Sequence, residues 1–171
     1  MIYAFIIILL LVIEIFYFKI AVKKNIKDTP NHRSAHISPT IRGGGIIFIP
    51  AIFLFVFFFS EEMSSYYFLV GAILLVATIS FIDDLISLST YKRMVVHFIA
   101  FTLVFYDLGF FNNIDLIIIG LLFLVYMFSL GFLNIYNFMD GINGITFLNA
   151  LVSYVTFYII NSYIIEFTNS D

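Results

Sequence analysis

Apolar residues fall into six long runs along the chain, and short polar segments separate these runs. The runs cover about residues 2–22, 44–60, 66–82, 94–111, 114–133 and 145–165. A helix needs about 20 mostly apolar residues to cross the hydrocarbon core of a bilayer, so each run is long enough, the second and third only just. The pattern predicts an all-α polytopic membrane protein, in which residues 1–171 form one bundle of six transmembrane helices with short loops.

The composition excludes an ordinary soluble domain. Hydrophobic residues make up 63% of the chain and charged residues 11%, whereas about 25% are charged in a globular protein. The absence of cysteine excludes disulfides, cysteine-based zinc sites and thiol nucleophiles, so any metal must bind oxygen or imidazole ligands. The first run has no basic residue before it and no small-residue cleavage pattern after it, and we interpret it as a span. The lipid bilayer is an expected partner and nucleic acid is not.

The positions of the basic residues predict the orientation in the membrane. All of them lie at the first and third interruptions between apolar runs: Lys19, Lys23, Lys24, Lys27, Arg33, Arg42, Lys92 and Arg93. Interruptions one, three and five share a side in an alternating bundle, and the positive-inside rule makes that side cytoplasmic. We therefore expect an N-terminus outside and a cytoplasmic functional face.

Each of these three interruptions contains polar residues that could have a purely structural role or a functional one. Asp83-Asp84 ends a span at the unfavourable end of the helix dipole, which a bound divalent cation would explain, although the two could simply be solvated loop acids. In the fifth interruption, Asn137, Asp140 and Asn143 recur at helical spacing, but Asp140 or Asn143 could simply cap the sixth span. In the first, the cations, histidines and glycines of residues 23–45 suit an anionic phosphate, although the lysines could only set topology and the glycines only make a turn.

Ionisable residues inside the apolar runs are functional candidates by default. We consider three of them, Glu14, His97 and Asp107. Asp107 lies near the end of a run and can reach water, and Glu14 lies about two turns from the basic loop. We single out His97, one turn after Arg93, as the candidate among the three.

Taken together, the three cytoplasmic segments resemble the polyprenyl-phosphate N-acetylhexosamine-1-phosphate transferases. This family, glycosyltransferase family 4, includes the phospho-MurNAc-pentapeptide transferase of peptidoglycan synthesis and the enzymes that start O-antigen and teichoic acid. The matching residues are Asp28, Pro30, Asn31, Arg33, His36, Pro39 and Arg42-Gly43-Gly44, then Asp83-Asp84 and Arg93, then Asn134, Asn137-Phe-Met-Asp140-Gly141 and Gly144. Their order, spacing and membrane placement all agree with the family.

The resemblance implies an Mg²⁺-dependent enzyme of the bacterial inner membrane, with Mn²⁺ as a possible substitute. It would transfer a sugar-1-phosphate from a UDP-N-acetylhexosamine to undecaprenyl phosphate, release UMP and so initiate a cell-envelope glycan such as a cell-wall polymer or lipopolysaccharide. By the same resemblance, Asp83, Asp84 and Asp140 are catalytic metal ligands, and one of the first two is a possible general base. The substrate-binding residues would be Asn137, Arg33, Arg42, Arg93, His36, Asn31 and Asp28.

The sequence departs from the family at two points. Asn143 stands where the family has a second aspartate, so an oxygen ligand is kept and a charge is lost. Family members are also about twice as long, and their second halves carry a Gly-Asp-x-Gly-Ser segment and a histidine-rich loop that these residues lack. Two alternatives therefore stay open: an inactive fragment that needs its C-terminal half, and a fragment of a cation transporter.

Overall fold

The computed structural model describes residues 1–29, 38–59, 66–139 and 145–165, and its fold is all-α. These residues form six α-helices, as predicted: α1 (Ile2–Lys23), α2 (Phe48–Phe58), α4 (Tyr67–Ile86), α5 (Thr90–Asp107), α6 (Leu116–Met139) and α7 (Ile145–Ile160). A 3-10 turn, η1 (Gly44–Ile47), leads into α2, and a π-helical turn, η2 (Asn161–Ile165), follows α7. Two short antiparallel strands, β1 (Lys27–Asp28) and β2 (Thr40–Ile41), pair Lys27 with Ile41.

Four stretches in the described part of the chain are long and apolar enough to cross a membrane. They are Ile2–Lys23, Tyr67–Ile86, Leu116–Tyr136 and Ile145–Tyr163. The apolar helix Gly44–Phe58 is shorter, and α5 has Lys92 and Arg93 in its first turn and Asp107 at its end. Four of the six predicted spans are thus confirmed as candidate spans, and the crossings by α2 and α5 stay predictions.

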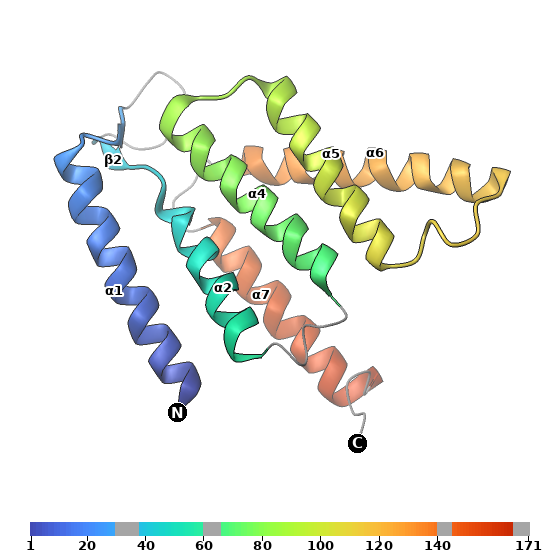
Figure 1. The fold of residues 1–171 in the computed structure, drawn as a ribbon, viewed down its shortest axis with the longest axis horizontal. Helices are drawn as coiled ribbons and strands as arrows, with labels where there is room; N and C mark the ends of the chain where they lie inside the picture. Colours follow the sequence, from blue (N-terminus) through green and yellow to red (C-terminus); the bar gives the residue numbers. More distant parts are fainter. Residues whose placement is uncertain (30–37, 60–65, 140–144, 166–171) are drawn as a thin grey trace.

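The helices α1, α2, α4 and α5 lie side by side, and α6 crosses α5 (Figure 1). The closest pair is α4 and α5, which share more contacts than any other two elements. The buried residues of this pair include Ala72 in α4 and Ala100 in α5, and small residues at an interface let two membrane helices approach closely.

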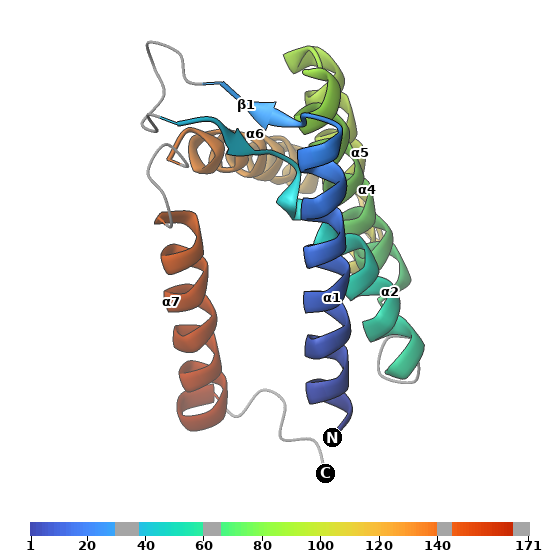
Figure 2. The same ribbon diagram turned by 90° about the vertical axis from the view of Figure 1, so that its left-hand side faces the viewer.

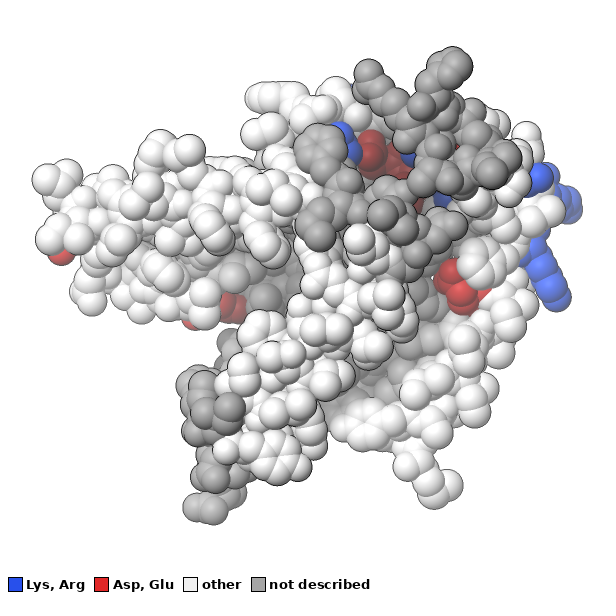
Figure 3. All heavy atoms as spheres, turned by 180° about the vertical axis from the view of Figure 1, so that it is seen from behind, with Lys and Arg blue, Asp and Glu red and all other residues white. Residues whose placement is uncertain are grey.

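The polar segments gather at one end of the molecule. The strand pair, the turn between α4 and α5, and the adjoining ends of α6 and α7 lie at this end in both ribbon views, and the two termini lie at the other (Figures 1 and 2). On the face in Figure 3, the Lys and Arg surface likewise lies at the upper end, and most of the body is white. The helices therefore bring the polar segments together, as expected from their alternation along the chain.

Asp107 is an ionisable residue in an apolar run, and a hydrogen bond to the neighbouring helix α4 explains its presence there. Its Oδ2 accepts a hydrogen bond of 2.8 Å from the backbone N–H of Leu69. That N–H belongs to the first turn of α4, where helical backbone donors have no partner within the helix. Asp107 therefore caps the neighbouring helix and joins the end of α5 to the start of α4.

We expect Asp107→Ala to lower the free energy of unfolding by about 1–3 kcal/mol, because it leaves a partly buried donor unsatisfied. Detergent-induced unfolding of the purified protein measures this loss. The matched control is Asp115→Ala, since Asp115 is exposed and accepts the backbone N–H of Ile118 at the start of α6, where water can replace it. An equal loss in both variants would contradict a special role for the contact between α4 and α5.

Candidate active site at the turn between α4 and α5

The two adjacent acids lie in the last turn of α4, because the helix continues four residues past the end of the predicted apolar run. The turn that follows is fixed by Asp83. Its Oδ1 accepts the backbone N–H of Leu88 at 2.6 Å, and its carbonyl accepts the N–H of Ser87, which has a left-handed φ of 46°. Asp83 thus ends the helix and directs the chain into α5.

Asp83 also forms an ion pair with Arg93 in the first turn of α5. The distance from Arg93 Nη1 to Asp83 Oδ2 is 3.1 Å, and the two side chains are 30% and 24% exposed. The Nε of Arg93 is buried and has no hydrogen-bond partner among the residues that the structure describes. Asp83 is therefore no solvated loop acid, because its carboxylate is held by Arg93 and by the turn.

A polar cavity of about 310 Å³ lies between α4, α5 and α6. Its polar lining residues are Ser80, Asp83, Asp84, Thr90, Arg93, His97 and Asn134. His97, the intramembrane residue that we singled out, lines this cavity. Its side chain is otherwise buried, because the residue is only 9% exposed. Carboxylate, amide and hydroxyl oxygens share the cavity with a guanidinium group, which suits a phosphate together with a hard cation.

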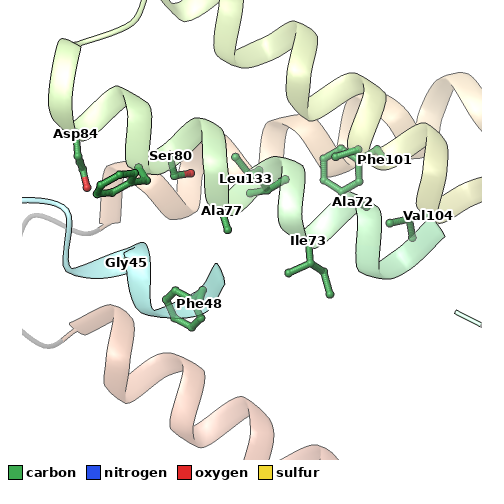
Figure 4. Close-up of a pocket in the computed structure, with 13 residues that line it drawn as sticks. Gly45, Phe48, Ala72, Ile73, Ala77, Ser80, Asp84, Phe101, Val104 and Leu133 are labelled. Carbon is green, nitrogen blue, oxygen red and sulfur yellow. The ribbon is translucent and has the colours of Figure 1, made fainter. Parts of the chain in front are cut away.

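An apolar groove of about 440 Å³ begins at the other side of Asp84 (Figure 4). It follows α4 from Asp84 through Ser80 and Ala77 to Ala72, and Gly45 and Phe48 form the opposite wall. Ser80 and Leu133 line both hollows, as Asp84 does. Asp84 is thus the carboxylate that the polar cavity and the apolar groove have in common.

Arg42 follows strand β2 and lies close to α1. Its Nη1 is 3.9 Å from Asp28 Oδ1, and both side chains are more than one third exposed, so this pair contributes little to stability. Arg42 and Asp28, both predicted as substrate-binding residues, therefore contact each other.

Several predicted residues lie outside the part of the chain that the structure describes. These are Asn31, Arg33, His36 and Asp140, and for Asn137 only the backbone in the last turns of α6 is described. Within the described ranges, no three His, Asp or Glu side chains are grouped so that they could hold a metal ion. The predicted metal set of Asp83, Asp84 and Asp140 accordingly stays a prediction.

Sequence reasoning missed Tyr17, which is 8% exposed and contacts the loop at Arg42. The sequence offers no signal for it, because the chain contains 11 tyrosines and Tyr17 is one aromatic residue among many in a mainly apolar run. Asn134 and Ser80 were likewise not predicted as site residues. Asn134 could have been found from its place in the motif that ends at Gly144, whereas Ser80 has no such signal.

The chain belongs to glycosyl transferase family 4, whose sequence profile matches residues 66–170. Membership implies transfer of a sugar-1-phosphate to a polyprenyl phosphate, with a lipid phosphate and a UDP-sugar as substrates. The match includes Asp83, Asp84 and the junction of α6 and α7, and it begins after the segment from Asp28 to Gly45. No curated protein and no solved structure matches the chain.

Proposed function

We propose that this protein transfers an N-acetylhexosamine-1-phosphate from a UDP-sugar to undecaprenyl phosphate and releases UMP. The observation that supports the proposal is the position of Asp84 between a polar cavity and an apolar groove along a candidate membrane span. One substrate is water-soluble and the other is confined to the bilayer, so the reacting groups must meet at such a boundary. The product is a diphosphate-linked lipid sugar, which initiates a bacterial cell-envelope glycan.

The phosphate of the lipid attacks the phosphorus atom that carries the sugar. One P–O bond forms, the P–O bond to UMP breaks, and UMP leaves with the electron pair. A phosphate monoester has its second pKa near 6, so the nucleophile is mostly ionised at neutral pH and needs no general base. The main task of the site is therefore to offset the repulsion between two anionic substrates.

The oxygen donors at the polar cavity fit Mg²⁺, or Mn²⁺ in its place, because these ions prefer carboxylate and carbonyl oxygens. Asp83 and Asp84 would hold the ion together with Asp140, and the bound ion would neutralise charge on the phosphate oxygens. Asp83 is shared with Arg93, so Asp84 is the carboxylate that we expect to contribute most.

The remaining polar residues are assigned by their chemistry. We infer that the Nε of Arg93 donates to a phosphate oxygen, which would satisfy a buried group that lacks a partner in the described part of the chain. Arg42 and Arg33 are proposed to contact phosphate as well. Asn137, His36, Asn31 and Asp28 are proposed to bind the nucleotide sugar by hydrogen bonds.

We also propose that α2 and α5 cross the membrane, which gives six spans, an N-terminus outside and an active site on the cytoplasmic face. The polar segments at one end of the molecule support this orientation, because the basic residues Lys23, Lys24 and Lys27 lie there too. The described acids Asp83 and Asp84 lie at this end of α4 rather than near its middle, which argues against an ion path at the bilayer midplane.

The test is an assay of membranes that carry the chain, with UDP-N-acetylhexosamines and undecaprenyl phosphate. We expect UMP release and a lipid-linked sugar phosphate, a loss of both on addition of EDTA, and recovery with excess Mg²⁺. Membranes without the protein are the control. Activity that resists EDTA would contradict the metal assignment, and no UMP release with any UDP-sugar, by the chain or by a longer product of its coding sequence, would contradict the proposed function.

The same assay separates the fragment interpretation from the others. The chain is expressed alone and together with any coding sequence downstream of Asp171. Activity only in the longer product would mean that the residues described here supply part of the site.

A further inference from the structure

We propose that Tyr17 in α1 is a positioning residue for Asp84, and that it acts through the peptide group between Arg42 and Gly43. This inference rests on the proposed function, in which Asp84 is the carboxylate next to the reacting phosphates. It adds a residue from outside the segment that matches the family profile, and it gives the first helix a part in the reaction.

The two ends of one peptide group face Tyr17 on one side and Asp84 on the other. The hydroxyl of Tyr17 donates a hydrogen bond of 2.6 Å to the carbonyl oxygen of Arg42. The backbone N–H of Gly43 lies next to the carboxylate of Asp84. The carbonyl and the N–H belong to the same planar group, so a rotation or shift of that plane changes both contacts together. Tyr17 and Asp84 are therefore linked, although α1 and α4 are separated by 43 residues of sequence between Lys23 and Tyr67.

The packing around this peptide leaves little room for another arrangement. The ring of Tyr17 makes an edge-on contact with the ring of Phe81, one turn before Asp84 on α4, at 6.0 Å between centroids. Gly43 has a φ of 81°, in the left-handed region that favours glycine. A Cβ at Gly43 would overlap the Tyr17 hydroxyl oxygen and would lie 3.1 Å from Phe81 Cε2. The glycine thus lets the loop approach both side chains.

The link is electronic as well as geometric. Donation to a carbonyl oxygen polarises the peptide, which makes its N–H a stronger donor, and chains of hydrogen bonds strengthen one another in this way. Tyr17 lines neither of the two hollows that Asp84 lines. We therefore expect the hydroxyl to affect the position of Asp84 and the turnover of bound substrate, and not to contact the substrate itself.

The experiment compares Tyr17→Phe with Tyr3→Phe in the protein reconstituted in lipid. Tyr17→Phe keeps the ring against Phe81 and removes only the hydroxyl. Tyr3→Phe removes a hydroxyl from the other end of the same helix, where the ring stacks on Phe59. We expect Tyr17→Phe to lower kcat about 3- to 10-fold, as for the loss of one hydrogen bond. KM for both substrates should change less than about twofold if the hydroxyl does not contact them. Tyr3→Phe should behave as the wild type.

A second measurement, hydrogen exchange of peptides that cover Thr40–Ile47, does not depend on activity. Tyr17→Phe should speed exchange in this segment, and Tyr3→Phe should not. Unchanged exchange in Tyr17→Phe would overturn the hydrogen-bonded link, and faster exchange with an unchanged kcat would overturn the positioning role. A higher KM with an unchanged kcat would instead make Tyr17 a binding residue, which also contradicts the proposal. Failure of the wild type to release UMP would overturn the proposed function itself, and the exchange result would still decide the link.

Discussion

Asp84→Asn is expected to abolish UMP release, with a loss of at least about 100-fold in kcat, the size seen when one electrostatic group is removed from a preorganised site. Asparagine has the same shape as aspartate and keeps an oxygen for the backbone N–H of Gly43, so the local fold should persist. What it loses is the negative charge at the junction of the polar cavity and the apolar groove. In the proposed function this charge would help to hold a cation that neutralises charge on the substrate phosphates.

The assay measures UMP release by equal amounts of membrane-inserted protein. Asp115→Asn is the matched control, because Asp115 is exposed and lies before the first residue of α6. The control should keep wild-type activity. Near-normal activity in Asp84→Asn would contradict the assignment of the site.

Arg93→Met should lower kcat/KM about 100-fold, because it removes two things at once. The first is the ion pair with Asp83, which leaves a carboxylate that is 24% exposed without its cation. The second is the buried Nε, which we assign to a phosphate oxygen. Arg93→Lys restores the charge beside Asp83 and not the planar fork of donors, so it should recover part of the activity and stay about 10-fold below the wild type.

Steady-state kinetics with each substrate varied in turn measure both variants. Lys92→Met is the control, because Lys92 is the exposed neighbouring cation and lines neither hollow. Equal losses of kcat/KM in Arg93→Met and Lys92→Met would mean that the loss comes from removing any positive charge in this region, and not from the contacts of Arg93. Full activity in Arg93→Lys would show that the donor geometry of arginine is not needed.

The pattern of apolar runs predicted which parts of the chain are helical, but it misplaced helix ends where polar residues continue the helix. The third run was predicted to stop at residue 82, yet α4 continues to Ile86 because the side chain of Asp83 satisfies the turn that follows. Similarly, α5 begins at Thr90 and includes Lys92 and Arg93, which the hydropathy of residues 94–111 does not cover. Hydropathy reports contact with lipid, whereas helix ends depend on hydrogen bonds.

The candidate site was predictable to the extent that it consists of neighbours in sequence. Asp83, Asp84 and Arg93 stand out by residue type and spacing, and the structure brings all three to one cavity. The sequence could not show that Asp83 and Arg93 pair with each other, since they were assigned to a metal and to a phosphate separately. Nor could it reveal the contact from Tyr17 to Arg42, because 25 residues separate them and nothing in the pattern marks the pair.

The groove along α4 has a consequence for how the reaction depends on concentration. Under the proposed function, the acceptor reaches Asp84 by diffusing in the plane of the bilayer, while the nucleotide sugar arrives from water. The rate should then follow the mole fraction of undecaprenyl phosphate among the membrane lipids, and diluting the vesicles in buffer should matter only through the nucleotide sugar. A short, water-soluble acceptor would lose this advantage of a two-dimensional search, even if its phosphate fitted the polar cavity equally well.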